Sequence, residues 1–164
     1  MALAKAGFEL TRSMQEADII LAHSGGCFVL PATPQALVIL MGLTHWPGKS
    51  IVRAIGQKIR GDLAVHRAEG GLGPWLRKTF WNGLYLCNMP ANIRMFQGRK
   101  HGAVWQLPAH NTILIRNRHD AFCTPQINEL PFAAMPQVVE LPGHHDDIWM
   151  HPERYVDIIK LHYG

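Results

Sequence analysis

Cysteine is scarce in this sequence, and the scarcity excludes two classes of protein. The three cysteines in 164 residues are Cys27, Cys87 and Cys123, and no two of them form a C-x-x-C pair. Such wide spacing argues against a disulfide framework and against a structural zinc site. We expect buried free thiols. Cys27 lies beside the serine motif described below, but a thiol nucleophile there would need a base partner of its own.

Long apolar runs are also missing. The longest, residues 36–43, is much shorter than the stretch of about 20 residues that spans a membrane. The first residues lack the basic segment, the apolar core and the cleavage site of a signal peptide. We therefore expect no membrane span and a cytoplasmic location, with residues 1–164 forming one compact domain.

Acidic side chains are outnumbered by basic ones, which gives the chain a net charge of +4. Most of the basic excess lies in the middle of the chain, between Lys49 and Lys100, whereas the segment from Asp120 onward is acidic. A basic middle segment could attract an anionic substrate or surface, and a solvated face would explain it equally. The segment lacks the interleaved aromatic and basic pattern of a nucleic-acid reader, so we expect no nucleic-acid partner.

The sequence does contain four short patterns, rich in β-branched and other apolar residues, that predict strands. They are residues 18–21, 37–41, 112–115 and 137–141. Helical patterns separate or follow these predicted strands, at residues 51–63, 75–86, 92–98 and 149–162. Asp146 and Asp147 are candidate caps for the last helix. The alternation predicts an α/β fold with a mostly parallel sheet and flanking helices.

The most informative motif follows the first of these strands and reads Ala22-His23-Ser24-Gly25-Gly26. A serine on a tight turn between a strand and a helix has its hydroxyl pushed outward, provided that the residues two before and two after it are small. Ala22 and Gly26 meet that demand. A helix that begins just past Ser24 would direct the Gly25 N–H toward a developing oxyanion.

Two further strands end in residues that such a serine would need. Asp120 follows the third strand, and His144 and His145 follow the fourth. Because functional groups gather at the carboxyl ends of parallel strands, Ser24, Asp120 and His145 could meet in one crevice. The chain order serine, aspartate, histidine is that of the α/β-hydrolase triad.

These motifs resemble those of the small α/β-hydrolase-fold serine hydrolases. The resemblance covers residues 17–155 and rests on the serine turn, on Arg118-His119-Asp120-Ala121-Phe122 and on Pro142-Gly143-His144-His145-Asp146-Asp147. It implies hydrolysis of an ester, thioester or amide of a small acyl substrate through an acyl-enzyme, without a cofactor.

The resemblance also implies a role for each residue of the site. Ser24 is then the nucleophile, His145 the base and later the acid, and Asp120 the residue that orients it. Gly25 and His23 then bind the oxyanion or the substrate. His144 takes the role of His145 if the alignment with the family's histidine motif shifts by one residue. The helical patterns at about 51–101 correspond to a cap inserted after the second strand, and their aromatic and methionine side chains could line a substrate cavity or form ordinary core.

The chain departs from the family pattern at its amino end. Only residues 1–16 precede the first strand, and they can supply one helix at most. The loop that gives the family its second oxyanion donor has no counterpart in them, and losing one such donor typically costs about 100-fold or more in rate. A hydrolase-like module that binds a ligand or a protein partner is therefore the alternative function. The sequence leaves open whether the chain forms a homo-oligomer.

Two rival motifs point to other chemistry. Residues 42–50 follow a strand and precede a helix as a nucleotide-binding P-loop does, but five residues separate the glycines where four are needed, and Pro47 lacks an N–H for phosphate. The cluster His144-His145-Asp146-Asp147 contains metal-ligand types, but adjacent residues rarely point to one ion. We expect neither a nucleotide nor a metal.

Overall fold

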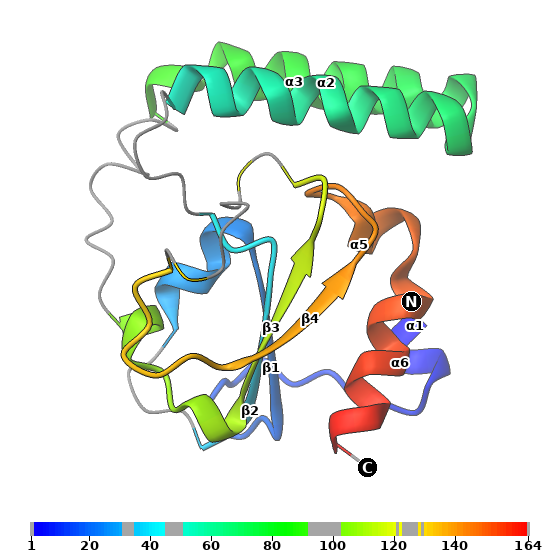
Figure 1. Cartoon of the computed structure of the whole chain (residues 1–164). Coiled ribbons are helices and arrows are strands. Elements are labelled where there is room, and N and C mark those ends of the chain that lie inside the picture. Colours follow the sequence, from blue (N-terminus) through cyan, green and yellow to red (C-terminus); the bar gives the residue numbers. More distant parts are fainter. Residues whose placement is uncertain are drawn as a thin grey trace.

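A computed structural model describes residues 2–30, 35–44, 51–91, 103–120, 122, 128 and 130–163, apart from the side chains of Ile51 and Ala103. The described residues form an α/β structure around a four-stranded, all-parallel sheet in the order β1-β2-β3-β4 (Figure 1). The predicted α/β class and the parallel sheet are thus confirmed. The strands are β1 (Ile19–His23), β2 (Leu37–Met41), β3 (Thr112–Asn117) and β4 (Gln137–Leu141).

The helical elements are connected to the strands in chain order. They are α1 (Ala2–Lys5), η1 (Ser24–Val29), α2 (Ile51–Gly70), α3 (Leu72–Cys87), η2 (Ala103–Gln106), η3 (Ala109–Asn111), α5 (Asp147–Met150) and α6 (Pro152–Tyr163), where η denotes a 3-10 helix. The expected helix after Ser24 is the short η1, and the expected helix at 92–98 lies outside the described residues. Among the described helices, none is both long and apolar enough to cross a membrane.

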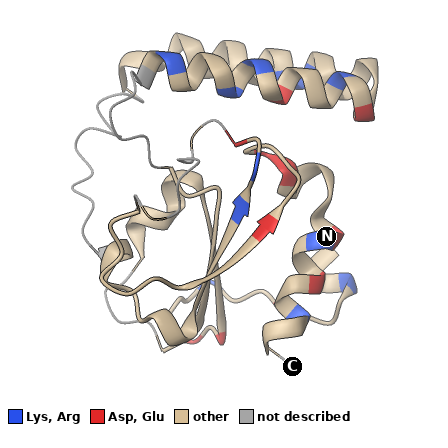
Figure 2. Ribbon diagram, viewed as in Figure 1, with Lys and Arg blue, Asp and Glu red and all other residues tan. Residues whose placement is uncertain are grey.

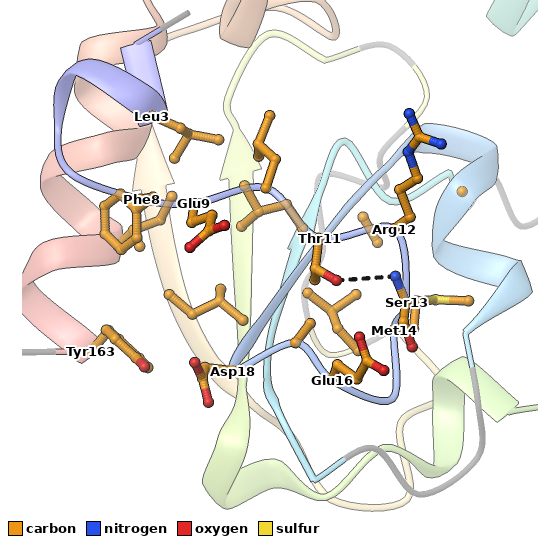
Figure 3. Close-up of a pocket in the computed structure, with 18 of the residues that line it drawn as sticks. Leu3, Phe8, Glu9, Thr11, Arg12, Ser13, Met14, Glu16, Asp18 and Tyr163 are labelled. Atoms are coloured by element: carbon orange, nitrogen blue, oxygen red, sulfur yellow. Dashed lines mark hydrogen bonds between the residues drawn. The ribbon is translucent and has the colours of Figure 1, made fainter.

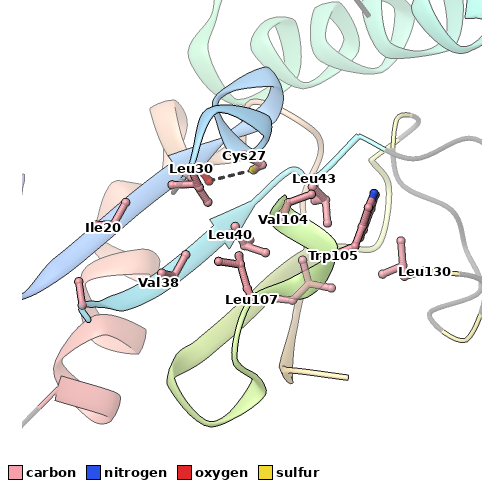
Figure 4. Packing of buried hydrophobic residues seen from close by; sticks show 13 residues of the cluster. Ile20, Cys27, Leu30, Val38, Leu40, Leu43, Val104, Trp105, Leu107 and Leu130 are labelled. Carbon is pink, nitrogen blue, oxygen red and sulfur yellow. Dashed lines mark hydrogen bonds between the residues drawn. The ribbon is translucent and has the colours of Figure 1, made fainter. Parts of the chain in front are cut away.

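Both faces of the sheet are covered, which explains why the central strands read as unbroken apolar runs. Alternate residues of β2 point to opposite faces: Val38 and Leu40 join one apolar cluster, and Ile39 and Met41 join another. Figure 4 shows the first cluster, in which Cys27 of η1, Leu30 directly after it and Val104 of η2 pack against the sheet. On the other face, α6 contributes Tyr155, Ile158 and Ile159.

The last helix is divided, although a single helix over residues 149–162 was expected. The division falls at His151, which ends α5 and precedes Pro152, the first residue of α6. Proline lacks an N–H and has a fixed φ, so it suits the first position of a helix and interrupts one that is already running. This break was readable from the sequence, because Pro152 lies inside the expected helix.

The long insertion between β2 and β3 contains α2 and α3, which pack against each other as a hairpin. In Figure 1 this hairpin lies beyond the ends of the strands, on the side where β3 and β4 have their arrowheads. Gly71 joins the two helices with a φ of 73°, a conformation that favours glycine. The α2–α3 hairpin therefore lies at the same end of the sheet as the loops that follow the strands.

Candidate active site

Ser24 occupies the sharp turn directly after β1. Its φ is 53°, the one positive φ outside glycine among the described residues. A left-handed conformation costs a serine about 1 to 2 kcal/mol, and it persists only where the surrounding structure imposes it. Ala22 before the turn is buried. At Gly26 a Cβ would meet no atom of the described residues within 4 Å, so no contact with this part of the chain explains the small residue expected there.

His145 connects Ser24 to Asp120. Its Nε2 lies 2.9 Å from Ser24 Oγ, and its Nδ1 lies 2.8 Å from Asp120 Oδ2. An ionised carboxylate only accepts hydrogen bonds, so Nδ1–H donates to Asp120 and the Nε2 lone pair faces the serine hydroxyl. The three residues come from the loops after β1, β3 and β4, because parallel strands end at one edge of the sheet.

His144, the substitute for His145, points elsewhere. Its ring lies 5.5 Å from that of His119, and it packs so closely on α2 that a Cβ on Gly61 would be 2.9 Å from its Nδ1. Its carbonyl accepts a 2.7 Å hydrogen bond from Asn117 Nδ2. The structure therefore brings His145, and not His144, to the serine.

The carboxylate of Asp120 is held on both sides. Its Oδ1 accepts a 2.8 Å hydrogen bond from the Phe122 N–H, while Oδ2 faces His145. The Phe122 ring meets the His145 ring edge-on, with 4.9 Å between their centres. Phe122 also packs against Ala54 and Ile55 of α2. The hairpin therefore contacts both the aspartate loop, which follows β3 and contains Asp120, and the histidine loop, residues 142–146 after β4.

Gly42 is a residue of this site that the sequence did not assign to it. It directly follows β2 with a φ of 55°, and a Cβ there would lie 3.1 Å from the Cε1 and Nδ1 atoms of His145 and 3.2 Å from His23 Nε2. Glycine suits both this φ and the close approach of the two rings. Its position at the carboxyl end of a strand was the available signal, but in the sequence it stood out only as the first glycine of the rival P-loop. Most of that loop, residues 45–50, lies outside the described residues.

His23 has a different contact from the one expected of an oxyanion or substrate ligand. Its Nε2–H donates a 2.9 Å hydrogen bond to the backbone carbonyl of His145. Burial, together with the neighbouring His145, lowers the pKa of His23 below its ordinary value of 6.5. A neutral His23 thus ties the end of β1 to the histidine loop. Gly25, the expected oxyanion donor, follows Ser24 in η1.

Asp146 forms ion pairs with the hairpin instead of capping a helix. It occupies the N-cap position of α5 but makes no side-chain capping bond, which makes the capping expectation wrong for this residue. Its Oδ2 contacts Lys78 Nζ and lies 2.8 Å from Lys58 Nζ. Lys58 also contacts Asp62, so Lys58, Asp62, Lys78 and Asp146 form one charged cluster. Burial alone would raise the pKa of Asp146, but Lys58 and Lys78 outweigh it and hold that pKa below its ordinary value.

Asp147 belongs to a second buried network, behind the histidine loop. Tyr155 Oη lies 3.1 Å from Asn117 Oδ1 and 3.3 Å from Asp147 Oδ2, and it accepts a 2.9 Å hydrogen bond from Asn117 Nδ2. Burial raises the pKa of Tyr155, so the hydroxyl keeps its proton and remains a donor. This network connects the end of β3 to α6 and supports the backbone of His144.

Three donor residues come close enough to suggest a metal ion. Ligand atoms of His23, His145 and Asp146 lie within 4.8 Å of one another. The His145 lone pair that a metal would need faces Ser24, however, and the carboxylate of Asp146 is already paired with two ammonium groups. These contacts suit proton transfer better than cation binding.

A cavity of about 940 Å³ lies along the edge of β1 that does not pair with β2 (Figure 3). It extends from Tyr163 and Asp18 to His23 and Gly26, and none of Ser24, Asp120 and His145 lines it. The hairpin aromatics expected around a substrate do not line it either. Phe80 and Trp81 are 62% and 59% exposed and contact each other edge-on, while Trp46, Met95 and Phe96 lie outside the described residues.

Comparison of the chain with known protein families, with curated proteins and with solved structures found no match.

Proposed function

We propose that this chain is a serine hydrolase of the α/β-hydrolase type, which cleaves an ester, thioester or amide through an acyl-enzyme. The observation that carries the proposal is the pair of contacts made by His145, at 2.9 Å to Ser24 Oγ and 2.8 Å to Asp120 Oδ2. Distances of this size are what a nucleophile, its base and the residue that orients the base require.

The first half of the reaction forms the acyl-enzyme. Ser24 Oγ attacks the carbonyl carbon of the substrate while its proton passes to His145 Nε2, and the carbonyl oxygen becomes an oxyanion next to the Gly25 N–H. The negative charge on Asp120 stabilises the imidazolium. His145 then gives its proton to the leaving group as the bond between that group and the acyl carbon breaks.

The second half releases the acid. A water molecule loses a proton to His145 and attacks the acyl carbon, and the returning proton restores the Ser24 hydroxyl when the ester bond breaks. The left-handed backbone at Ser24 supports this role, because it is a strained conformation at the residue whose hydroxyl must project. The contacts of the α2–α3 hairpin with both loops support its interpretation as a cap, with a small acyl compound as the substrate.

The test is covalent labelling with a fluorophosphonate, followed by intact-mass analysis. Ser24 Oγ forms a bond to phosphorus, fluoride leaves, and the serine proton goes to His145. We expect one adduct on the wild type and on the control Ser13→Ala, and none on Ser24→Ala. If the folded wild type gains no adduct, the proposal is wrong and the non-catalytic binding module becomes the better description.

A further inference from the structure

The side chains of two lysines in the α2–α3 hairpin contact Asp146, the residue that follows His145. Lys58 comes from α2 and Lys78 from α3, and both contact Asp146 Oδ2 although they are 88 and 68 positions away in the sequence. Lys78 Nζ also lies 3.5 Å from Asp62 Oδ2. The cluster therefore joins both helices of the hairpin to the histidine loop.

The cluster is buried and balanced in charge. The side chains of Lys58 and Lys78 are 13% and 17% exposed, and those of Asp62 and Asp146 are 1% and 11% exposed. Two ammonium groups and two carboxylates cancel, which is the condition under which such charges tolerate burial. These two lysines are thus not part of a solvated basic face, although other basic residues are spread along the hairpin (Figure 2).

The histidine loop has few ways to move while the cluster is intact. The His145 carbonyl is held by His23, the His144 carbonyl by Asn117, and the Asp146 carboxylate by the two lysines. The first two contacts come from the ends of β1 and β3, and only the third comes from the hairpin. Releasing the lysines would therefore remove the ion pairs that hold Asp146 to α2 and α3, while the sheet contacts and the packing of His144 on α2 stay in place.

We infer that Lys58 and Lys78 are positioning residues, which act through Asp146 to hold His145 against Ser24 and so make the reactivity of the serine depend on the docked hairpin. This inference rests on the proposed function for its consequence in activity, and on the cluster geometry for its consequence in structure. A displacement of a catalytic group by about 1 Å can cost about 100-fold in rate. We therefore expect a loss of that order when the link is cut.

The decisive variant is the double substitution Lys78→Met/Asp146→Leu. It removes one positive and one negative charge together, so that Lys58 and Asp62 remain as a balanced pair and we expect the fold to be retained. Met matches the length of lysine, and Leu has a branched side chain of similar size to aspartate but no acceptor for Lys58 Nζ. Arg60→Met is the matched control, because Arg60 is an exposed base on α2 two residues from Lys58. The single variant Lys78→Arg keeps the charge and serves as the conservative rescue.

Two measurements separate positioning from general damage. The first is the second-order rate of fluorophosphonate labelling, which we expect to fall about 100-fold in the double variant and to stay within about 3-fold of wild type in Arg60→Met and Lys78→Arg. The second is the proton NMR signal of His145 Nδ1–H, which its hydrogen bond to Asp120 shifts far downfield. We expect that signal to move or broaden in the double variant while circular dichroism shows a folded chain.

The outcomes also separate this inference from the proposed function. A folded double variant that keeps both the wild-type labelling rate and the wild-type signal overturns the positioning role and leaves the hydrolase proposal standing. A wild type that is not labelled overturns the hydrolase proposal, and the His145 signal alone then decides whether the cluster holds the ring. Loss of folding in the double variant, with Lys78→Arg folded and active, would show that the cluster stabilises the chain as a whole and would also count against the inference.

Discussion

Gly42→Ala is the substitution that tests the geometry around His145 most directly. The residue has a φ of 55°, a conformation that costs alanine about 1 to 2 kcal/mol relative to glycine. In a chain of this length that loss lowers the melting temperature by about 2 to 8 °C. The new methyl group would also lie 3.1 Å from the imidazole of His145, so the ring must shift by a few tenths of an ångström.

That shift acts on a hydrogen bond of 2.9 Å between His145 Nε2 and Ser24 Oγ. We expect the rate of fluorophosphonate labelling to fall about 10-fold, less than for a displacement of a full ångström. The matched control is Gly56→Ala in α2, where a new Cβ meets no described atom within 4 Å and helix propensity improves by about 1 kcal/mol. That variant should melt at a higher temperature and react at the wild-type rate.

The assay is a time course of labelling by intact mass, together with thermal unfolding followed by circular dichroism. If Gly42→Ala reacts as fast as wild type and melts at the same temperature, then the His145 ring does not lie against Gly42 as described. The placement of the histidine loop would then need to be revised.

Three further substitutions test other parts of the site. Asp120→Asn should slow labelling by about 10⁴-fold, because an amide stabilises the imidazolium poorly and favours the wrong tautomer, whereas Asp157→Asn on the exposed side of α6 should not. His23→Asn should flatten the dependence of stability on pH. The lowered pKa of His23 means that, between its folded pKa and pH 6.5, the unfolded chain binds a proton that the folded chain does not, so the contribution of His23 to the free energy of unfolding rises with pH over that range and is level above it. The measurement is urea unfolding at several pH values. If the free energy of unfolding depends on pH equally in His23→Asn and in wild type, this prediction is wrong. Gly143→Ala should cost about 1 to 3 kcal/mol in urea unfolding, since its Cβ would lie 2.6 Å from Cγ of the buried Asp147, and a neutral result would contradict that packing.

The sequence by itself determined the sheet and the three candidate residues of the site. The predicted strands at 37–41 and 137–141 coincide with β2 and β4. β2 is apolar throughout because it is buried on both faces, whereas β4 is an edge strand whose Gln137 and Glu140 are exposed. Ser24, Asp120 and His145 were predictable because each follows a strand, and parallel strands deliver their carboxyl ends to one edge. These are local patterns combined with one rule of topology.

Only the tertiary structure decided what surrounds His145. The choice between His144 and His145 depended on which ring faced Ser24 once the loop was folded. The role of Gly42 and the pairing of Lys58 and Lys78 with Asp146 depend on contacts between distant parts of the chain, which leave no periodic trace in the sequence. The sequence does not distinguish a lysine that pairs in a buried cluster from one that faces solvent. Only the packing of the hairpin against the histidine loop makes that distinction.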